Sequence, residues 1–167
     1  MIPMRPKPDD YKVLFQKALA AGQKRDYPRA VDLLTRITSE TELIPQAYLY
    51  LGRAYHAMGR YDLAIQPLRY FVRFTPESPA GYFFLGRSYL ALDLPVHAVR
   101  NLKKALELQP DSVQALGLVG LAYLKAKRPE VASSYLGRAV ELDPDNKNLY
   151  TAYLNSLLVH ATSLFSR

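Results

Sequence analysis

The sequence predicts an all-α fold in which one helix-turn-helix unit is repeated along the chain. The first observation is a period of thirty-four residues, marked by Gly52, Gly86 and Gly120. The second is that each glycine has the same companions: tyrosine three residues later, alanine twelve later, leucine sixteen later and proline twenty-four later. Self-similarity of this length is typical of stacked helical repeats. We therefore expect function to reside in a surface built by stacking and not in a catalytic pocket.

The first helix of each unit is predicted from its apolar spacing. In the second full unit Tyr82, Leu85, Gly86 and Tyr89 follow one another at intervals of three and four, which places them on one helical stripe. The pattern predicts that these first helices end near three positions of one column, Gly59, Asp93 and Lys127.

The second helix of each unit has clear boundaries. Pro95 and Pro129 suit the first helical position, where a missing N–H costs nothing. The prolines twenty-four residues after each glycine stop the second helix. Three side-chain oxygens then follow that are expected to cap the next first helix: Ser78, Ser112 and Asn146.

The glycine column has a steric explanation. We expect each glycine to face the small alanine of its second helix, so that the two backbones approach closely. The tyrosine and leucine columns are expected to fill the space on either side. A larger residue at Gly86 should therefore overpack the pair.

Residues 11–44 form a degenerate first unit ahead of three regular units at 45–78, 79–112 and 113–146. Ala18 and Ala21 stand at its glycine and tyrosine positions, and Glu42 stands where proline is expected. Terminal repeats are commonly atypical because one face meets solvent. Residues 1–10 are predicted to be a proline-rich leader, and 147–167 a final capping or docking helix.

The columns resemble the tetratricopeptide repeat (TPR) family over about residues 11–146. The segments that carry the likeness are Leu51-Gly52-x-x-Tyr55, Gly59-Arg60-Tyr61-x-x-Ala64 and Pro76. The resemblance implies a right-handed α-solenoid of four TPR units plus a C-terminal capping helix. It also implies that the first helices line a concave groove, that the second helices form the convex back, and that the chain is a scaffold or adaptor for a protein or peptide.

The chain departs from the family pattern at a few positions. Leu14 and Leu116 stand where an aromatic residue is expected early in the first helix. Phe71 replaces a usually small residue, and Pro67 lies inside a second helix, where it should kink the helix or free one carbonyl.

The family geometry predicts which side chains face the groove. They are mostly aromatic and aliphatic, with two arginines one repeat apart: Phe15, Leu49, Tyr50, Arg53, His56, Phe83, Phe84, Arg87, Leu118, Leu121 and Lys125. Such a lining suits an amphipathic helix or an extended apolar segment that carries a carboxylate. In the alternative interpretation, the arginines are only solvated and the aromatic rings pack on neighbouring helices.

Two known TPR functions do not match the residues. A chaperone carboxylate clamp needs lysines, asparagines and an arginine, but of the corresponding positions in either register only Arg53 is basic. The asparagine ladder of glycosyltransferase-linked members corresponds here to Gln16, Tyr50, Phe84 and Leu118.

The last helix carries apolar residues around more than half of its circumference. Six of them are candidate docking residues: Tyr150, Tyr153, Leu154, Leu157, Leu158 and Phe165. The helix is either a plain cap, or it docks on a second copy or a partner, or it is followed by a fifth repeat. A self-associating or larger assembly is the second functional hypothesis.

No set of residues predicts an enzyme, a cofactor or a metal site. His56, His97 and His160 fall in different units without acidic partners at helical metal spacing. The serines and acids form no nucleophile–base set, and there is no glycine-rich phosphate loop. The sequence holds no cysteine and no apolar run long enough to span a membrane. With no secretory signal at its start, a cytoplasmic location is expected.

The net charge of +7 raises the question of an anionic partner. Basic residues gather along the second helices: Arg36, Arg69, Arg73, Arg100, Lys103, Lys104 and Arg138. Three of them, Arg36, Lys104 and Arg138, occupy equivalent positions and predict a positive ridge on the convex side. A nucleic-acid or membrane-surface adaptor that uses this ridge ranks third, because charge alone is weak evidence.

Overall fold

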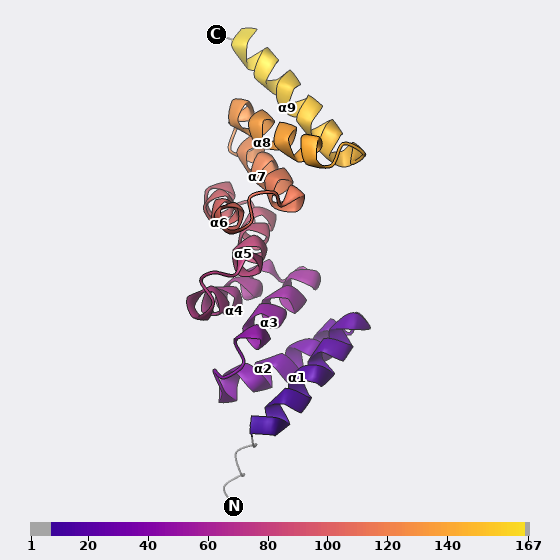
Figure 1. The fold of residues 1–167 in the computed structure, drawn as a ribbon, viewed down its shortest axis with the longest axis vertical. Coiled ribbons are helices and arrows are strands. Elements are labelled where there is room, and N and C mark those ends of the chain that lie inside the picture. The colour runs from indigo at the N-terminus through magenta and orange to yellow at the C-terminus, as the bar shows by residue number, and fades with distance from the viewer. Residues whose placement is uncertain (1–7, 166–167) are drawn as a thin grey trace, which may run out of the picture. The chain divides into compact units, whose positions relative to one another are not determined.

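In the computed structural model the described part of the chain is residues 8–165, with side chains for residues 10–164. Every regular element in this part is an α-helix, which confirms the all-α class predicted from the sequence (Figure 1). The helices are α1 (Pro8–Gln23), α2 (Tyr27–Glu40), α3 (Pro45–Ala57), α4 (Tyr61–Phe74), α5 (Pro79–Ala91), α6 (Pro95–Leu108), α7 (Val113–Lys125), α8 (Pro129–Leu142) and α9 (Lys147–Phe165).

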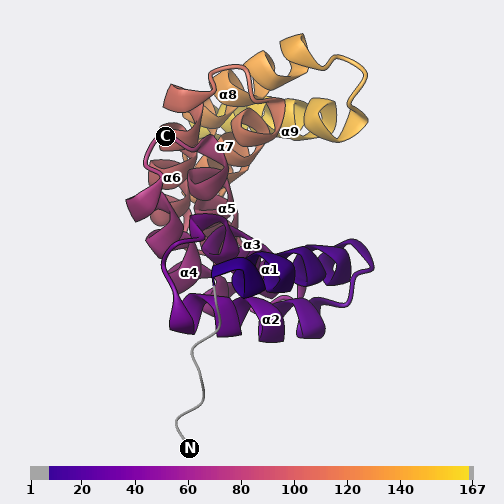
Figure 2. The same cartoon turned by 60° about the horizontal axis from the view of Figure 1, so that its bottom comes forward.

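Two compact units make up the chain, and the division between them falls after Pro76. In the first unit α1 pairs with α2 and α3 with α4, while α2 packs on α3. Figure 2 shows α1 and α2 lying side by side in indigo. In the second unit α5 pairs with α6 and α7 with α8, α6 packs on α7, and α9 packs on α8. We call α1, α3, α5 and α7 the first helices, and α2, α4, α6 and α8 the second helices.

Helix α1 begins earlier than the sequence pattern predicted. Its first residue is Pro8, so the last three residues of the segment predicted as a leader belong to a helix. Proline is well suited to a helix start because its missing N–H would be unpaired there in any case. The remainder of that segment, residues 1–7, lies outside the described residues.

Each glycine of the column receives the side chain of the leucine sixteen residues later. A Cβ built on Gly52, Gly86 or Gly120 would lie 2.4, 2.5 or 2.4 Å from a leucine Cγ, in the order Leu68, Leu102 and Leu136. The carbonyl oxygens of Ala64 and Ala98 would lie 3.1 Å from the Cβ at Gly52 and Gly86. The close approach is therefore confirmed, but its partner was wrongly assigned: the leucine, and not the alanine side chain, fills the space that each glycine leaves.

The degenerate first unit packs in the same way with different residues. Ala18 and Ala21, at the glycine and tyrosine positions, are buried in one cluster with Ala30, Leu34 and Ile37. The second unit holds its own cluster, built on Ala98, Leu102, Val119 and Ala122. The core of each unit therefore comes from residues that recur at the repeat period.

The turns between paired helices follow one pattern. The carbonyls of Tyr55, Tyr89 and Tyr123 each accept a hydrogen bond of 2.9 Å from the backbone N–H five residues on. This is the closure in which the residue before the donor takes a left-handed conformation. That residue recurs every thirty-four positions, with positive φ at all of them: Arg25 (60°), Gly59 (73°), Asp93 (57°) and Lys127 (56°). Two of the four helix ends thus bend at a residue for which this conformation is costly, namely Arg25 and Lys127, whereas glycine and aspartate tolerate it.

Two of the three predicted helix caps are confirmed. The Ser112 hydroxyl accepts from the backbone N–H of Ala115, and the Asn146 side-chain oxygen from that of Leu149, both at 3.3 Å. The prediction for Ser78 is wrong, because its side chain makes no capping hydrogen bond at the start of α5.

The prolines behave largely as predicted. Pro95 and Pro129 stand in the first turn of α6 and α8. Helix α4 continues through the buried Pro67, so the carbonyl of Leu63 receives no N–H from that position. Phe71, on the same helix, is buried at 3% exposure.

Replacing Gly86 with alanine should lower the free energy of unfolding by about 1–3 kcal/mol, because its Cβ would overlap the Leu102 side chain and approach a backbone oxygen. Gly22 in α1 is the matched control, since nothing lies within 4 Å of a Cβ there. Gly22→Ala should raise the free energy of unfolding by roughly 0.5–1 kcal/mol, because alanine reduces the backbone freedom of the unfolded chain. Urea unfolding followed by circular dichroism measures both. A shift of the same sign in the two variants would contradict this account.

The turn residues with positive φ predict opposite changes in stability for two substitutions. Lys127→Gly should stabilise the chain by roughly 0.5–1 kcal/mol, because relief of the left-handed conformation outweighs the added flexibility of glycine. Gly59→Ala should destabilise it by about 1 kcal/mol, although no atom lies within 4 Å of its Cβ position. Thermal melts of the two variants beside the parent provide the measurement. An unchanged melt for Gly59→Ala would show that the turn conformation carries no strain.

Candidate functional site

The side chains predicted to face a groove are distributed over the first helices of both units. Phe15 lies on α1, and four others lie on α3. The rest lie on α5 and α7 of the second unit. Each unit therefore presents its own part of the first-helix surface.

In the first unit an arginine lies over an aromatic pair. The rings of Phe15 and Tyr50 meet edge to face, with centroids 5.7 Å apart. The guanidinium carbon of Arg53 lies 4.9 Å from the centroid of Tyr50. Both rings are half-buried while Arg53 is exposed. A cation over an aromatic face is attracted by the ring quadrupole, so this arginine is oriented by the protein while it faces solvent.

Two other predicted residues of α3 contribute less to that surface. Leu49 is buried at 9% exposure, so its assignment to the exposed lining is corrected. His56 is half-buried, and its ring centroid lies 4.9 Å from that of Tyr61 at the start of α4. The imidazole therefore packs on the second helix of its own repeat.

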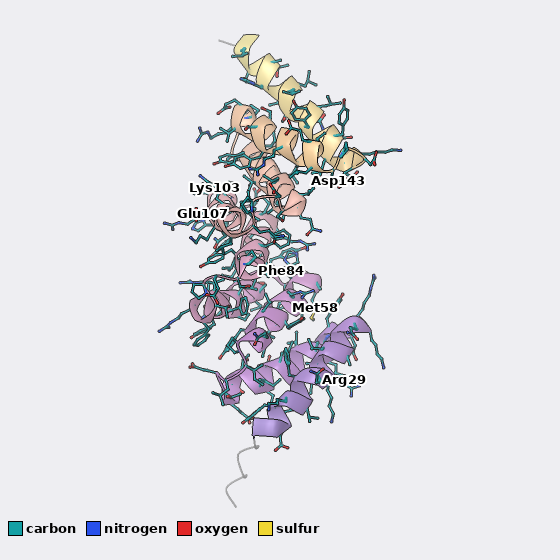
Figure 3. The ribbon with its side chains drawn as sticks, viewed as in Figure 1. Arg29, Met58, Phe84, Lys103, Glu107 and Asp143 are labelled. Carbon is teal, nitrogen blue, oxygen red and sulfur yellow. The ribbon has the colours of Figure 1, made fainter. Side chains whose placement is uncertain are left out.

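In the second unit the first-helix surface contains a hollow of about 520 Å³. The start of α5, the end of α6 and the start of α7 form it, and it includes Phe84, which is labelled on α5 in Figure 3. The rings of Phe83 and Phe84 meet edge to face with centroids 5.3 Å apart. The complete lining is Pro79, Ala80, Phe83, Phe84, Ala105, Gln109, Asp111, Ser112, Val113, Gln114 and Ala115.

Two alanines line this hollow, and one of them, Ala80, stands where all the other repeats carry larger residues. At the position of Ala80 the other repeats have Lys12, Gln46 and Gln114. At the position of Ala105 the first two repeats have Ile37 and Phe71. Phe83 and Phe84 were predicted from the sequence but the hollow was not, since its only sequence signal is the single small residue Ala80 in its column.

The hollow combines apolar walls with a polar rim that includes one carboxylate, Asp111. Gln109 and Gln114 supply amides that can donate and accept hydrogen bonds. Asp111 is held by Arg138, whose Nη2 lies 2.7 Å from its Oδ1, so its charge is compensated. Pockets of a few hundred cubic ångströms with apolar walls and few polar groups suit an apolar side chain or a small ligand.

The remaining predicted residues extend this surface along α5 and α7. Arg87 and Leu121 are exposed, and Leu118 is half-buried. The Nζ of Lys125 lies 2.7 Å from Oδ1 of Asp93, the left-handed residue of the α5–α6 turn. This ion pair is exposed, so it contributes little to stability but partly neutralises the lysine.

The basic column of the second helices is compensated by acids. Arg36 pairs with Glu40, Lys104 with Glu107 and Arg138 with Asp111, at 3.6, 2.8 and 2.7 Å. The hydrogen bond between Lys104 and Glu107 raises the pKa of the lysine and lowers the pKa of the carboxyl. Lys103 and Glu107 project from the same stretch of α6 (Figure 3). The positive ridge predicted from Arg36, Lys104 and Arg138 is therefore reduced by local pairing.

One residue predicted to dock a partner serves the fold instead. A Cβ on Gly137 of α8 would lie 3.3 Å from Cε2 of Tyr153, whose side chain is half-buried. Tyr153 therefore packs α9 onto α8 and is removed from the exposed docking set. The side chain of Phe165 lies outside the described residues.

Residues 8–165 offer neither a cluster of metal ligands nor a membrane span. Across this stretch no three His, Cys, Asp or Glu side chains gather closely enough to hold a metal ion. None of its helices combines the length and the apolar character needed to cross a membrane.

Comparison with solved structures finds the same fold in several proteins. The crystal structure of MamA protein matches with a TM-score of 0.87 at 19% identity, over 93% of this chain and 85% of that chain. MamA 41-end from Desulfovibrio magneticus RS-1 matches with a TM-score of 0.77 at 21% identity, over 84% of this chain and 79% of that chain. TTC0263, a thermophilic TPR protein of Thermus thermophilus, matches with a TM-score of 0.69 at 22% identity, over 89% of this chain and 81% of that chain. At these identities the likeness shows the fold alone.

Among curated proteins no sequence matches significantly. The family profile described as tetratricopeptide repeat matches residues 15–79 and 83–147, which together form most of the chain. These two segments contain the glycine, tyrosine, alanine and leucine columns of the three regular units. The chain therefore belongs to the tetratricopeptide-repeat family and has its α-solenoid fold class.

Proposed function

We propose that this protein is an adaptor that holds a segment of a partner protein on its first helices, with one large apolar side chain of that segment seated in the hollow of the second unit. The TPR fold supports a protein-interaction scaffold in general. The hollow beside Phe83 and Phe84 is the observation that carries the more specific proposal. In this proposal the chain binds and positions a partner and performs no chemical step.

The hollow has the properties of an anchoring site. Binding energy at protein interfaces concentrates in a few large side chains that fill desolvated pockets. Two aromatic rings in edge-to-face contact provide a rigid apolar wall, and Ala80 leaves it open. The amides of Gln109 and Gln114 at the rim can pair with the partner's backbone.

The charge near the hollow favours an acidic segment. Arg87 follows Phe83 and Phe84 by four and three residues on α5, so it lies one helical turn along the same face. It is exposed, and the whole chain carries a net charge of +7. A guanidinium in this position can bind a carboxylate through two parallel hydrogen bonds. We infer that the partner segment carries an Asp or Glu about one turn from its apolar anchor.

Selection from a displayed library of random peptides tests the proposal directly, because it requires no identified partner. Selected peptides should share a large apolar residue and a nearby acid. Phe84→Ala should weaken their binding roughly 10-fold or more, the loss expected of an interface hot spot. Ala80→Gln should do the same by filling the hollow with the residue that Gln46 and Gln114 supply in other repeats.

Arg87→Glu should also weaken binding, whereas Arg100→Glu on α6 is the matched control and should leave it unchanged. Circular dichroism verifies that every variant keeps its helices. Peptides that bind the three site variants as tightly as the parent would contradict the proposed site. Selection of peptides without acids would contradict the role of Arg87 alone.

A further inference from the structure

Helix α9 uses one face to pack on the repeat before it. A Cβ on Gly117 of α7 would lie 2.7 Å from Cδ2 of Leu149, and Tyr153 lies over Gly137 of α8. Ser156 is fully buried, and its hydroxyl donates to the Tyr153 carbonyl at 2.6 Å. This inner face is therefore closely packed, and the last turns of α9 project past α8 (Figure 1).

A second face of α9 is apolar and open to solvent. Its residues follow one another at intervals of three and four along a single helical stripe. Their exposed fractions lie between 39% and 64%: Tyr150, Leu154, Leu157, Leu158 and Leu164. Ala161 lies on the same stripe and is exposed. Five large apolar side chains in one exposed stripe indicate an interaction surface.

The repeat register explains why this stripe is open. Leu154 falls thirty-four residues after Gly120, and Leu157 the same distance after Tyr123. In α7 the glycine position is closed by Leu136 of the paired helix α8. Within residues 8–165 no helix follows α9 to pair with it. Helix α9 thus stands at the place of a first helix, and among the described residues its pairing face is uncovered.

The side-chain sizes on α9 define what can pair with it. In the regular repeats a leucine of the second helix fills the space left by a glycine of the first. Here a leucine, Leu154, already occupies the glycine position, so the pairing helix must bring a small residue. Helix α9 carries that residue itself, because Ala161 lies on the same stripe two turns after Leu154. Two copies packed antiparallel, with a two-fold axis between Leu157 and Leu158, would place each Leu154 against the other copy's Ala161.

The charges favour the same arrangement. No Asp, Glu, Lys or Arg occurs between Lys147 and Arg167, whereas the whole chain carries +7. Two copies of α9 therefore meet with little repulsion. In the alternative arrangement, α9 stacks on α1 of another copy, which would bring this uncharged helix against the basic side chains of Lys12 and Lys17.

We propose that two copies of this protein associate through α9, each covering the open pairing face of the other. The surface involved is on the order of 500 Å² for each copy, which places the dimer in the weak and reversible class of interfaces. The proposal is independent of the hollow and of any partner bound there. Dimerisation would present two peptide-binding surfaces in one particle.

Sedimentation velocity over a range of roughly 1 µM to 1 mM covers the affinities expected of so small an interface. The mass should rise from one chain to two and then stop. Leu158→Glu should remain a monomer throughout, because the carboxylate would be buried against Leu157 of the other copy. Val96→Glu is the matched control, since Val96 is an aliphatic residue on α6 at least as exposed as Leu158, and it should dimerise as the parent does.

A charge pairing tests the register. Leu157→Lys alone should also remain a monomer, but an equimolar mixture with Leu158→Glu should form the dimer, because the introduced ammonium of one copy then opposes the introduced carboxylate of the other at the axis. A parent that stays monomeric would overturn the proposal and indicate a different protein as the occupant of α9. Growth beyond two chains would overturn it in favour of end-to-end stacking, and a mixture that fails to associate would overturn the antiparallel register.

Discussion

The contact between a glycine of the first helix and a leucine of the second is the constraint on which the rest of this structure depends. At Gly52, Gly86 and Gly120 a leucine Cγ lies within 2.5 Å of the position that a Cβ would take, so a side chain at the glycine would clash with the paired helix. The left-handed turn residue at the same period then closes each hairpin at a fixed length. Since every regular hairpin is built alike, residues thirty-four apart occupy equivalent places. Surface features then arise wherever one repeat departs from its column.

The two candidate interaction surfaces arise from such departures. Ala80 is smaller than the residues at equivalent positions, and it lines the hollow of the second unit. At α9 larger residues take part: Leu149 and Tyr153 fill the spaces left by Gly117 and Gly137 of the preceding repeat. Leu154 stands where the regular repeats have a glycine. The small residue in the second unit leaves space that a partner's side chain can fill. The larger residues of α9 leave an apolar face uncovered. The same rule of size complementarity that builds the core therefore also identifies the two surfaces that we propose as binding sites.

The helices, their order and the family could be predicted from the sequence because the thirty-four-residue period records the packing directly. Packing details that depend on several helices could not. The partner of each glycine was wrongly assigned, because spacing shows which residues face each other but not how a leucine rotamer fills the gap. Leu49 and Tyr153 were placed on exposed faces, since periodicity cannot show how closely a neighbouring helix covers them. Ser78 shares its position with the capping Ser112, yet makes no cap hydrogen bond. The hollow needs residues from three helices and was invisible to any one column.

A double-mutant cycle between Gly86 and Leu102 tests the central constraint most directly. If the leucine fills the space of the missing Cβ, Gly86→Ala should cost much less in a Leu102→Ala background than in the parent, with a coupling energy of about 1–2 kcal/mol. Urea unfolding of the parent, the two single variants and the double variant yields this energy. Strictly additive effects would show that the glycine is required for some other reason, and the packing account of the repeat would be contradicted.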